Sequence, residues 1–364
     1  MHWILKIIFE GVYDPESYLH ALLGKPHIVQ MIWLMIQHNW KNYIKQPMKS
    51  FEASYNSNGE IEFFRRYWKV SFPKPTNGIN INMMPFIASK NFNDTKLPGS
   101  LKCYASMIEA VMTIAYGYNN VNQSKEEGKI YFLTIQESWV DAKTSQRRPG
   151  LHTDNPGPVT IKKCFSEANS ASKHSTYVAS NNEGSGSYAN IRCEHFWGNG
   201  MMINVPNPIG GIYMSSNVEH SCKVWNCKVE ADKDSGDEAI SNFGDIEHLR
   251  RFLLDEDADI LEANRLYWIT DRTPHESVPL EKGQFRQFFR IVTSQVSLWF
   301  VDDNTENPNG VKPDPNITKI VKGSKFNPGS LEIVESKNED ICAEKVSNNL
   351  LKNFGKLILG KKKQ

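Results

Sequence analysis

Two histidines and an aspartate have the residue types and positions that metal chemistry requires. His152 and Asp154 form the His-x-Asp of the segment RRPGLHTDNPG, and His275 lies in LYWITDRTPHESVPL. In a β-strand, residues two apart point to the same face, so His152 and Asp154 can present an imidazole and a carboxylate to one ion. His275 is expected to add a third ligand from the end of a strand. Two histidines and one carboxylate leave positions open on an octahedral metal, which suits Fe(II) and its reaction with O₂.

A second pattern begins eleven residues after His275 and predicts a place for an anion. The segment GQFRQFFRIVTSQVSLWF alternates as a strand, with Arg286, Phe288 and Arg290 on one face. A guanidinium can hold a carboxylate through two hydrogen bonds. Two arginines on an apolar strand face therefore indicate an anionic ligand.

The order of these residues resembles the signature of the Fe(II)- and 2-oxoglutarate-dependent dioxygenases, which share a double-stranded β-helix. The resemblance implies that His152, Asp154 and His275 hold Fe(II). It also implies that 2-oxoglutarate chelates the iron and that Arg286 binds its distal carboxylate, with Arg290 supporting or replacing Arg286. Such an enzyme uses O₂ to hydroxylate or otherwise oxidise a substrate, here unidentified, and releases succinate and CO₂.

Several ligand roles stay open in the sequence. Thr134 and Gln136 share one face of the strand before the His-x-Asp, where they either reach the co-substrate or are ordinary barrel residues. The interval of 121 residues between Asp154 and His275 leaves room for a different third ligand. The rival candidates are His195 and His220.

Two functions of other classes compete with the dioxygenase. One is a cupin-like metal enzyme that does not use 2-oxoglutarate. The other is a non-enzymatic jelly-roll structural or interaction protein, such as a virion component. Dependence on 2-oxoglutarate separates the first from the dioxygenase, whereas large self-association without iron indicates the second.

The pattern of elements predicts an α+β chain built on a double-stranded β-helix, or jelly-roll, core at 129–300. A helical and mixed N-terminal region, 1–128, is expected to pack on this core, and a turn-rich extension follows at 301–364. Two insertions are expected to interrupt the core: a mobile loop at 166–187 and an acidic helical stretch at 232–262.

Hydrophobic periodicity predicts the individual elements. A helix over 101–116 is expected to bury the stripe of Cys103, Met107, Val111 and Ile114. The side chains expected to dock the second insertion are Phe252, Leu253 and Ile260. Further helices are expected within 18–43 and 346–359, and strands at 129–140, 188–197, 211–216, 222–229, 265–269 and 285–300.

Composition excludes several classes of function. The 42 Lys+Arg and 41 Asp+Glu residues give a net charge of +1, which disfavours binding to bulk nucleic acid. With 40% hydrophobic residues, the chain has the composition of a folded globular protein. The six cysteines are scattered and indicate no disulfide framework. Because no apolar stretch approaches about 20 residues and no signal peptide is recognisable, we expect an intracellular, cytoplasmic protein without a membrane partner, of open oligomeric state.

Overall fold

The computed structural model describes most of the chain between residues 63 and 333. The described residues are 44–45, 63–76, 78–117, 122–155, 159–165, 187–193, 195–204, 207–229, 240–241, 244–326 and 331–333. The helices expected within 18–43 and 346–359 lie outside them, as does the loop expected at 166–187 except for its last residue.

Six antiparallel strands form the largest sheet, in the order β2-β13-β9-β15-β4-β3. Their bounds are β2 Phe64–Lys69, β3 Asn80–Ile87, β4 Ile130–Val140, β9 Ile212–Ser216, β13 Arg265–Ile269 and β15 Gln284–Val292. The strands predicted at 129–140, 211–216 and 265–269 are confirmed by β4, β9 and β13. β2 and β3 belong to the N-terminal region, so this region supplies both edges of the sheet as well as a cover for it.

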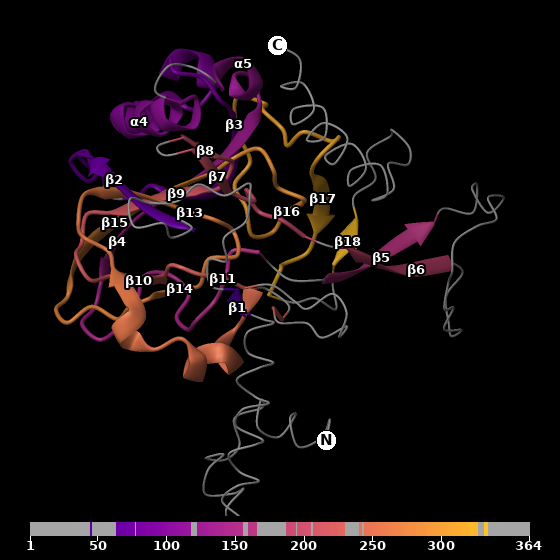
Figure 1. Cartoon of the computed structure of the whole chain (residues 1–364). Helices are drawn as coiled ribbons and strands as arrows, with labels where there is room; N and C mark the ends of the chain where they lie inside the picture. The colour runs from indigo at the N-terminus through magenta and orange to yellow at the C-terminus, as the bar shows by residue number, and fades with distance from the viewer. Residues whose placement is uncertain are drawn as a thin grey trace, which may run out of the picture.

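Helices cover one face of the six-stranded sheet (Figure 1). They are the 3₁₀ helices η1 Phe92–Thr95 and η2 Gly99–Tyr104, followed by α4 Ala105–Ala115 and α5 Gln123–Glu126. The predicted helix over 101–116 is confirmed, and its Met107, Val111 and Ile114 are buried. Cys103 is exposed, contrary to the prediction. It lies in η2, where three residues per turn move it out of the stripe that the α-helical period buries.

A smaller sheet lies on the opposite side of the six-stranded sheet from α4 (Figure 1). Its strands are β12 Ala258–Ile260, β10 Cys222–Trp225 and β14 His275–Ser277, in the order β12-β10-β14. Cys222 and Val224 of β10 pack in one hydrophobic cluster with Met214 of β9 and Phe288 of β15. Residue His152 extends the smaller sheet by a single antiparallel bridge to β14.

The chain passes back and forth between these two sheets. Eight segments take part, and four of them lie in the large sheet: β4, β9, β13 and β15. The other four lie in the small sheet: the His152 bridge, which follows β4, then β10 and β12, which lie between β9 and β13, and β14, which lies between β13 and β15. The pairings are nested: β4 with β15, His152 with β14, β9 with β13, and β10 with β12. This nesting brings the segment after β4 next to the start of β14, although they are far apart in sequence.

The remaining described strands form smaller sheets. β16 Leu298–Phe300, β17 Lys319–Lys322, β18 Glu332–Ile333, β5 Val159–Phe165 and β6 Ser187–Cys193 make a five-stranded sheet. β7 Met201–Asn204 pairs with β8 Asn207–Ile209, and β1 Ile44–Lys45 pairs with β11 Lys228–Val229. Figure 1 shows β5 and β6 extending away from the two sheets that face each other.

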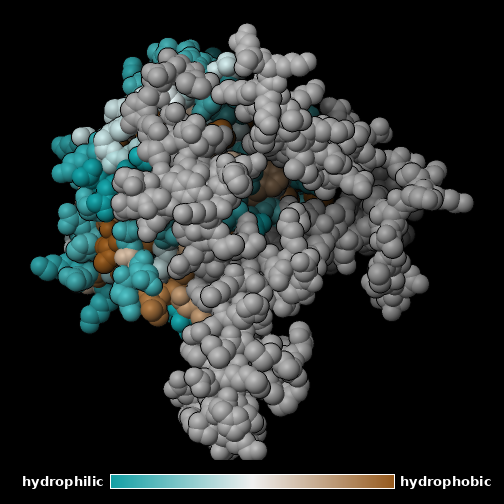
Figure 2. All heavy atoms as spheres, viewed as in Figure 1, coloured by the Kyte–Doolittle hydropathy of each residue, from teal (hydrophilic) through white to brown (hydrophobic). Residues whose placement is uncertain are grey.

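The second insertion contains 3₁₀ turns in its described part instead of a long helix. These turns are η5 Glu247–Phe252 and η6 Asp255–Asp257. Leu253 is buried and Phe252 packs against the same cluster, as expected. Ile260 does not dock: it is 46% exposed, because it ends the edge strand β12. Figure 2 shows a mostly hydrophilic described surface with hydrophobic atoms exposed near β10.

None of the helices among the described residues has the length and apolar character that crossing a membrane requires.

Candidate functional site

The structure brings His152, Asp154 and His275 together between the two facing sheets. The backbones of His152 and His275 exchange two hydrogen bonds, with N···O distances of 3.0 and 2.9 Å. Their imidazole ring centres are 4.4 Å apart. The Oδ2 atom of Asp154 lies 3.7 Å from Nε2 of His275. One bridge within the smaller sheet therefore joins His152 to His275, which lies 123 positions further along the sequence.

Both imidazoles are held by their Nδ1 atoms. Nδ1 of His152 lies 2.7 Å from the carbonyl oxygen of Gly150, and Nδ1 of His275 lies 3.0 Å from that of Thr273. Because a carbonyl oxygen only accepts hydrogen bonds, each Nδ1 carries the proton and each Nε2 keeps its lone pair. A backbone carbonyl on the second ring nitrogen is the usual way in which proteins orient a metal-binding histidine.

Electrostatics favour the neutral form of both rings. Burial lowers the pKa of His152, and the neighbouring His275 lowers it further, to well below the usual range. Burial also lowers the pKa of His275, although the carboxylate of Asp154 opposes this effect. Neutral imidazole is the form that binds metals.

The Asp154 side chain is 9% exposed and is fixed on one side only. Its Oδ1 atom accepts a hydrogen bond of 2.7 Å from Nη1 of Arg290. Burial opposes ionisation of Asp154, but the charge of Arg290, together with His275, His152 and Arg147, outweighs it and holds the pKa of this carboxyl far below its usual range. The other oxygen, Oδ2, is buried without a hydrogen-bond partner among the described residues. A buried carboxylate oxygen of this kind normally has a partner.

The three side chains fit the chemistry of an Fe(II) site but are not closed around a metal position. Among the described residues, no group of three or more His, Cys, Asp or Glu side chains has an arrangement that could hold a metal ion. The donor set nevertheless fits, because it combines two imidazoles with free Nε2 lone pairs and a carboxylate with an unpartnered Oδ2.

Arg286 lies on the same face of β15 as Arg290, four residues before it in the sequence. It has no carboxylate partner among the described residues. Its register partner on β4 is Ser138, whereas that of Arg290 is Thr134, so the two arginines are about 13 Å apart along the strand. Nε of Arg286 donates to Oγ of Ser216 at 3.1 Å, and its Nη1 is buried without a hydrogen-bond partner. Burial lowers the pKa of Arg286 to about 10. The predicted face of Arg286, Phe288 and Arg290 is confirmed.

A third guanidinium, which the sequence did not single out, completes this face. Cζ of Arg147 lies 4.9 Å from the ring centre of Phe288, and its Nη1 donates to Oε1 of Gln136 at 3.0 Å. Gln136 therefore supports a cation beside the site. The hydroxyl of Thr134 is engaged elsewhere, since it accepts from the backbone N–H of Met83 at 3.1 Å. The adjacent RR of RRPGLHTDNPG was the one available signal for Arg147.

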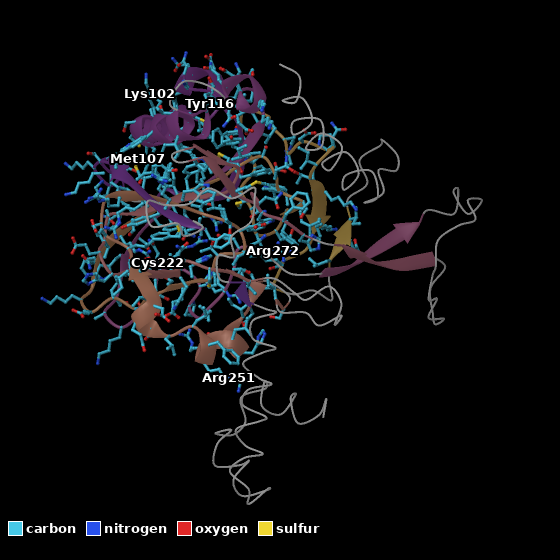
Figure 3. The ribbon with its side chains drawn as sticks, in the orientation of Figure 1. Lys102, Met107, Tyr116, Cys222, Arg251 and Arg272 are labelled. Carbon is cyan, nitrogen blue, oxygen red and sulfur yellow. The ribbon has the colours of Figure 1, made fainter. Side chains whose placement is uncertain are left out.

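The rival histidines do not join the three ligands. His220 is exposed in the turn between β9 and β10. His195 is buried near β16, with Nδ1 3.3 Å from Oγ of Ser297. Figure 3 labels Cys222 on β10 and Arg272 in the turn before β14, and these two residues mark the sheet that carries His275. Met107 of α4 lies on the other side of the large sheet in the same view.

Gly244 shapes the segment that carries Asp154, and its replacement is expected to disturb that segment. Its φ is +78°, and a Cβ there would lie 2.1 Å from the carbonyl oxygen of Thr153. We expect Gly244→Ala to lower the free energy of unfolding by more than about 3 kcal/mol, since the backbone must move as well as adopt a strained φ. Urea denaturation measures this loss.

Gly310→Ala is the matched control for that prediction. Gly310 has a φ of +81°, but a Cβ there would meet nothing within 4 Å. Only the conformational cost of about 1–2 kcal/mol is then expected. Equal losses in the two variants would show that the contact between Gly244 and Thr153 is not tight.

Asp271 links the backbone at Trp197 to the backbone at Asn155, next to Asp154, and is expected to make stability depend on pH. Its Oδ2 accepts from the backbone N–H of Trp197 at 2.9 Å, and its carbonyl accepts from that of Asn155 at 2.7 Å. Burial raises the pKa of Asp271 to about 6. Because the unfolded value is about 3.9, the folded protein binds this proton more tightly. The contribution of Asp271 to stability is thus complete below pH about 4 and falls by about 3 kcal/mol as pH rises through 6.

Asp271→Asn isolates this contribution. Between pH 4 and pH 7, the free energy of unfolding of the wild type should fall by about 2 kcal/mol relative to that of Asp271→Asn. Urea denaturation of both proteins at the two pH values measures it. A difference that is constant with pH would contradict the assignment.

Comparison with known proteins adds no relative. No family model, curated protein or solved structure matches this chain.

Proposed function

We propose that this chain is an Fe(II)- and 2-oxoglutarate-dependent oxygenase. The observation that carries the proposal is the buried meeting of His152, Asp154 and His275, with Arg286 further along the face of β15 that carries Arg290. Two oriented imidazoles face a carboxylate whose Oδ2 lacks a hydrogen-bond partner, and a guanidinium with an unpartnered Nη1 lies on the adjacent strand face. One arrangement thus offers donors for a cation and for an anion.

The strand order supports a double-stranded β-helix as the core. In a jelly roll, eight segments alternate between two facing sheets and pair from the outside inwards. Eight segments follow this scheme, with the His152 bridge in second place and β14 in seventh. In chain order they are β4, the His152 bridge, β9, β10, β12, β13, β14 and β15. Under this proposal, the first two ligands come from the second segment and the third from the seventh.

The chain's own residues have separate tasks in the proposed reaction. His152 and His275 would bind Fe(II) through Nε2, and Asp154 would bind it through Oδ2. Arg290 holds Asp154 ionised and oriented through Oδ1. Bound Fe(II) and 2-oxoglutarate supply the activation of O₂, with the balance R–H + 2-oxoglutarate + O₂ → R–OH + succinate + CO₂.

Arg286 is the proposed anchor for the distal carboxylate of 2-oxoglutarate. Arg290 already has an anionic partner in Asp154, whereas Arg286 contacts the neutral Ser216 and Phe288. A buried guanidinium without a carboxylate is costly, so an incoming carboxylate is strongly favoured there. The ring of Phe288 lies against Arg286 and excludes water from this side of the site.

Formation of succinate tests the proposal. The full chain, incubated with Fe(II), 2-oxoglutarate and O₂, should convert 2-oxoglutarate to succinate slowly even without a primary substrate. Omission of Fe(II) should abolish the conversion. If the protein binds iron but forms no succinate and has no affinity for 2-oxoglutarate, the cupin-like metal enzyme becomes the better account. If it binds neither, the non-enzymatic jelly roll does.

A further inference from the structure

Positive charge around the proposed site exceeds what Fe(II) chemistry with 2-oxoglutarate needs. Four cations gather there: Arg147, Arg286, Arg290 and Lys325. Among the described residues, the carboxylates that act on this group are Asp154 and, at Lys325, Asp303. Fe(II) and 2-oxoglutarate carry opposite charges of equal size, so their binding leaves about two positive charges without a counter-ion among the described residues.

The four cations lie at two depths. Arg286 and Arg290 are 1% and 4% exposed, and each has a buried guanidinium nitrogen without a hydrogen-bond partner among the described residues. Arg147 and Lys325 are only partly buried. We call Arg147 and Lys325 the outer pair. A co-substrate anchored at Arg286 would therefore lie deeper than a second ligand held by the outer pair.

The outer pair is built into the site by neighbouring aromatic rings. Cζ of Arg147 lies over Phe288, the ring that also carries Arg286 on β15. Nζ of Lys325 lies 4.9 Å from the ring centre of Trp197. Aromatic faces hold a cation in place without neutralising its charge. The charges of Arg147 and Lys325 consequently stay available to a ligand.

The mutual repulsion of these cations supports the same conclusion. Burial, together with the charges of Arg290 and Arg147, lowers the pKa of Lys325 to about 8. Burial lowers the pKa of Arg147 to about 9, again with a contribution from Arg290. An anion that binds between Arg147 and Lys325 offsets the cost of burying their charges and the repulsion between them.

We propose that the primary substrate carries an anionic group, a carboxylate or a phosphate, which Arg147 and Lys325 bind. This inference rests on the proposed function, because it assigns Arg286 to 2-oxoglutarate and leaves the outer pair to the substrate. The anionic group then positions the rest of the substrate toward His152, Asp154 and His275.

Calorimetric titration with two small anions tests the proposal. Inorganic phosphate and acetate are titrated into the full chain, anaerobically, with Fe(II) and saturating 2-oxoglutarate, and then without either. With Fe(II) and 2-oxoglutarate bound, so that Arg286 is occupied, we expect one saturable anion per chain and an affinity for it about 10- to 100-fold weaker in Arg147→Gln and in Lys325→Gln. Tighter phosphate would assign a phosphorylated substrate, and tighter acetate a carboxylate.

The controls keep the result interpretable. Lys322→Gln removes an exposed lysine of β17 and should leave anion affinity unchanged. Because Arg147 and Lys325 repel each other, replacing either should raise the Tm of the anion-free protein, which separates lost binding from misfolding. Absence of saturable binding, or affinity that neither substitution changes, would overturn the proposal.

The two proposals fail separately. Anion binding that depends on Arg147 and Lys325 in a protein without affinity for Fe(II) would keep the anion site and reject the oxygenase. Fe(II) and 2-oxoglutarate binding without a second anion would keep the oxygenase and reject an anionic substrate.

Discussion

A His275→Ala variant is expected to lose stoichiometric Fe(II) binding while it keeps its fold. The substitution removes the imidazole whose Nε2 faces Oδ2 of Asp154, but it retains the backbone hydrogen bonds with His152. Loss of a residue that only orients a ligand already costs about 10- to 100-fold in metal affinity, so loss of a ligand should cost more than about 100-fold. Metal analysis of protein reconstituted anaerobically and then desalted measures this loss.

His220→Ala is the control for that experiment. It removes an exposed histidine outside the site, so iron binding should stay stoichiometric. Circular dichroism of both variants reports whether the β-sheet core persists. If His275→Ala retains full iron, the third ligand lies elsewhere and His195 becomes the next residue to replace.

An Arg286→Ala variant is expected to weaken 2-oxoglutarate binding by about 100-fold or more while iron affinity stays unchanged. Removal of the guanidinium deletes two charge-assisted hydrogen bonds, each of which contributes about 1.5–3 kcal/mol. The described contacts of Arg286 are with Ser216 and Phe288, not with the three metal ligands. The dependence of succinate formation on 2-oxoglutarate concentration, together with direct binding, measures the effect.

Two further variants sharpen this prediction. Arg286→Lys keeps the charge but loses the planar fork, so its affinity should fall between those of the wild type and Arg286→Ala. Arg66→Ala removes an arginine of β2 whose ion pair with Glu262 is on the surface, and it should leave the affinity unchanged. Unchanged affinity in Arg286→Ala would transfer the anchor to Arg290 or Arg147.

Patterns with a short period made part of this structure predictable from sequence. Along β15, a period of two residues places Arg286, Phe288 and Arg290 on one face, as expected. The strands β4, β9 and β13 were predictable from their β-branched and aromatic residues and from the turn residues around them. The buried stripe of α4 follows from its helical period, and it fails only at Cys103, where the helix is still 3₁₀.

The arrangement of the site depended on contacts that no local pattern encodes. His152 lies in a single bridge and Asp154 in the bend after it, so their shared orientation comes from the bridge to His275 and the pair with Arg290, not from a regular strand. Lys325 reaches the site from a turn after β17 in the C-terminal extension. The bridge between His152 and His275 results from nested pairing within the two facing sheets, which becomes apparent only when all eight segments are in place.

The visible spectrum of the anaerobic protein with Fe(II) and 2-oxoglutarate tests the central claim most directly. If His152, Asp154 and His275 hold Fe(II) and 2-oxoglutarate chelates it, a weak charge-transfer band should appear when both are added and should be absent with either alone. The band should persist in His220→Ala and disappear in His275→Ala. Absence of the band in a wild-type protein that is folded and exposed to saturating Fe(II) and 2-oxoglutarate would contradict the account.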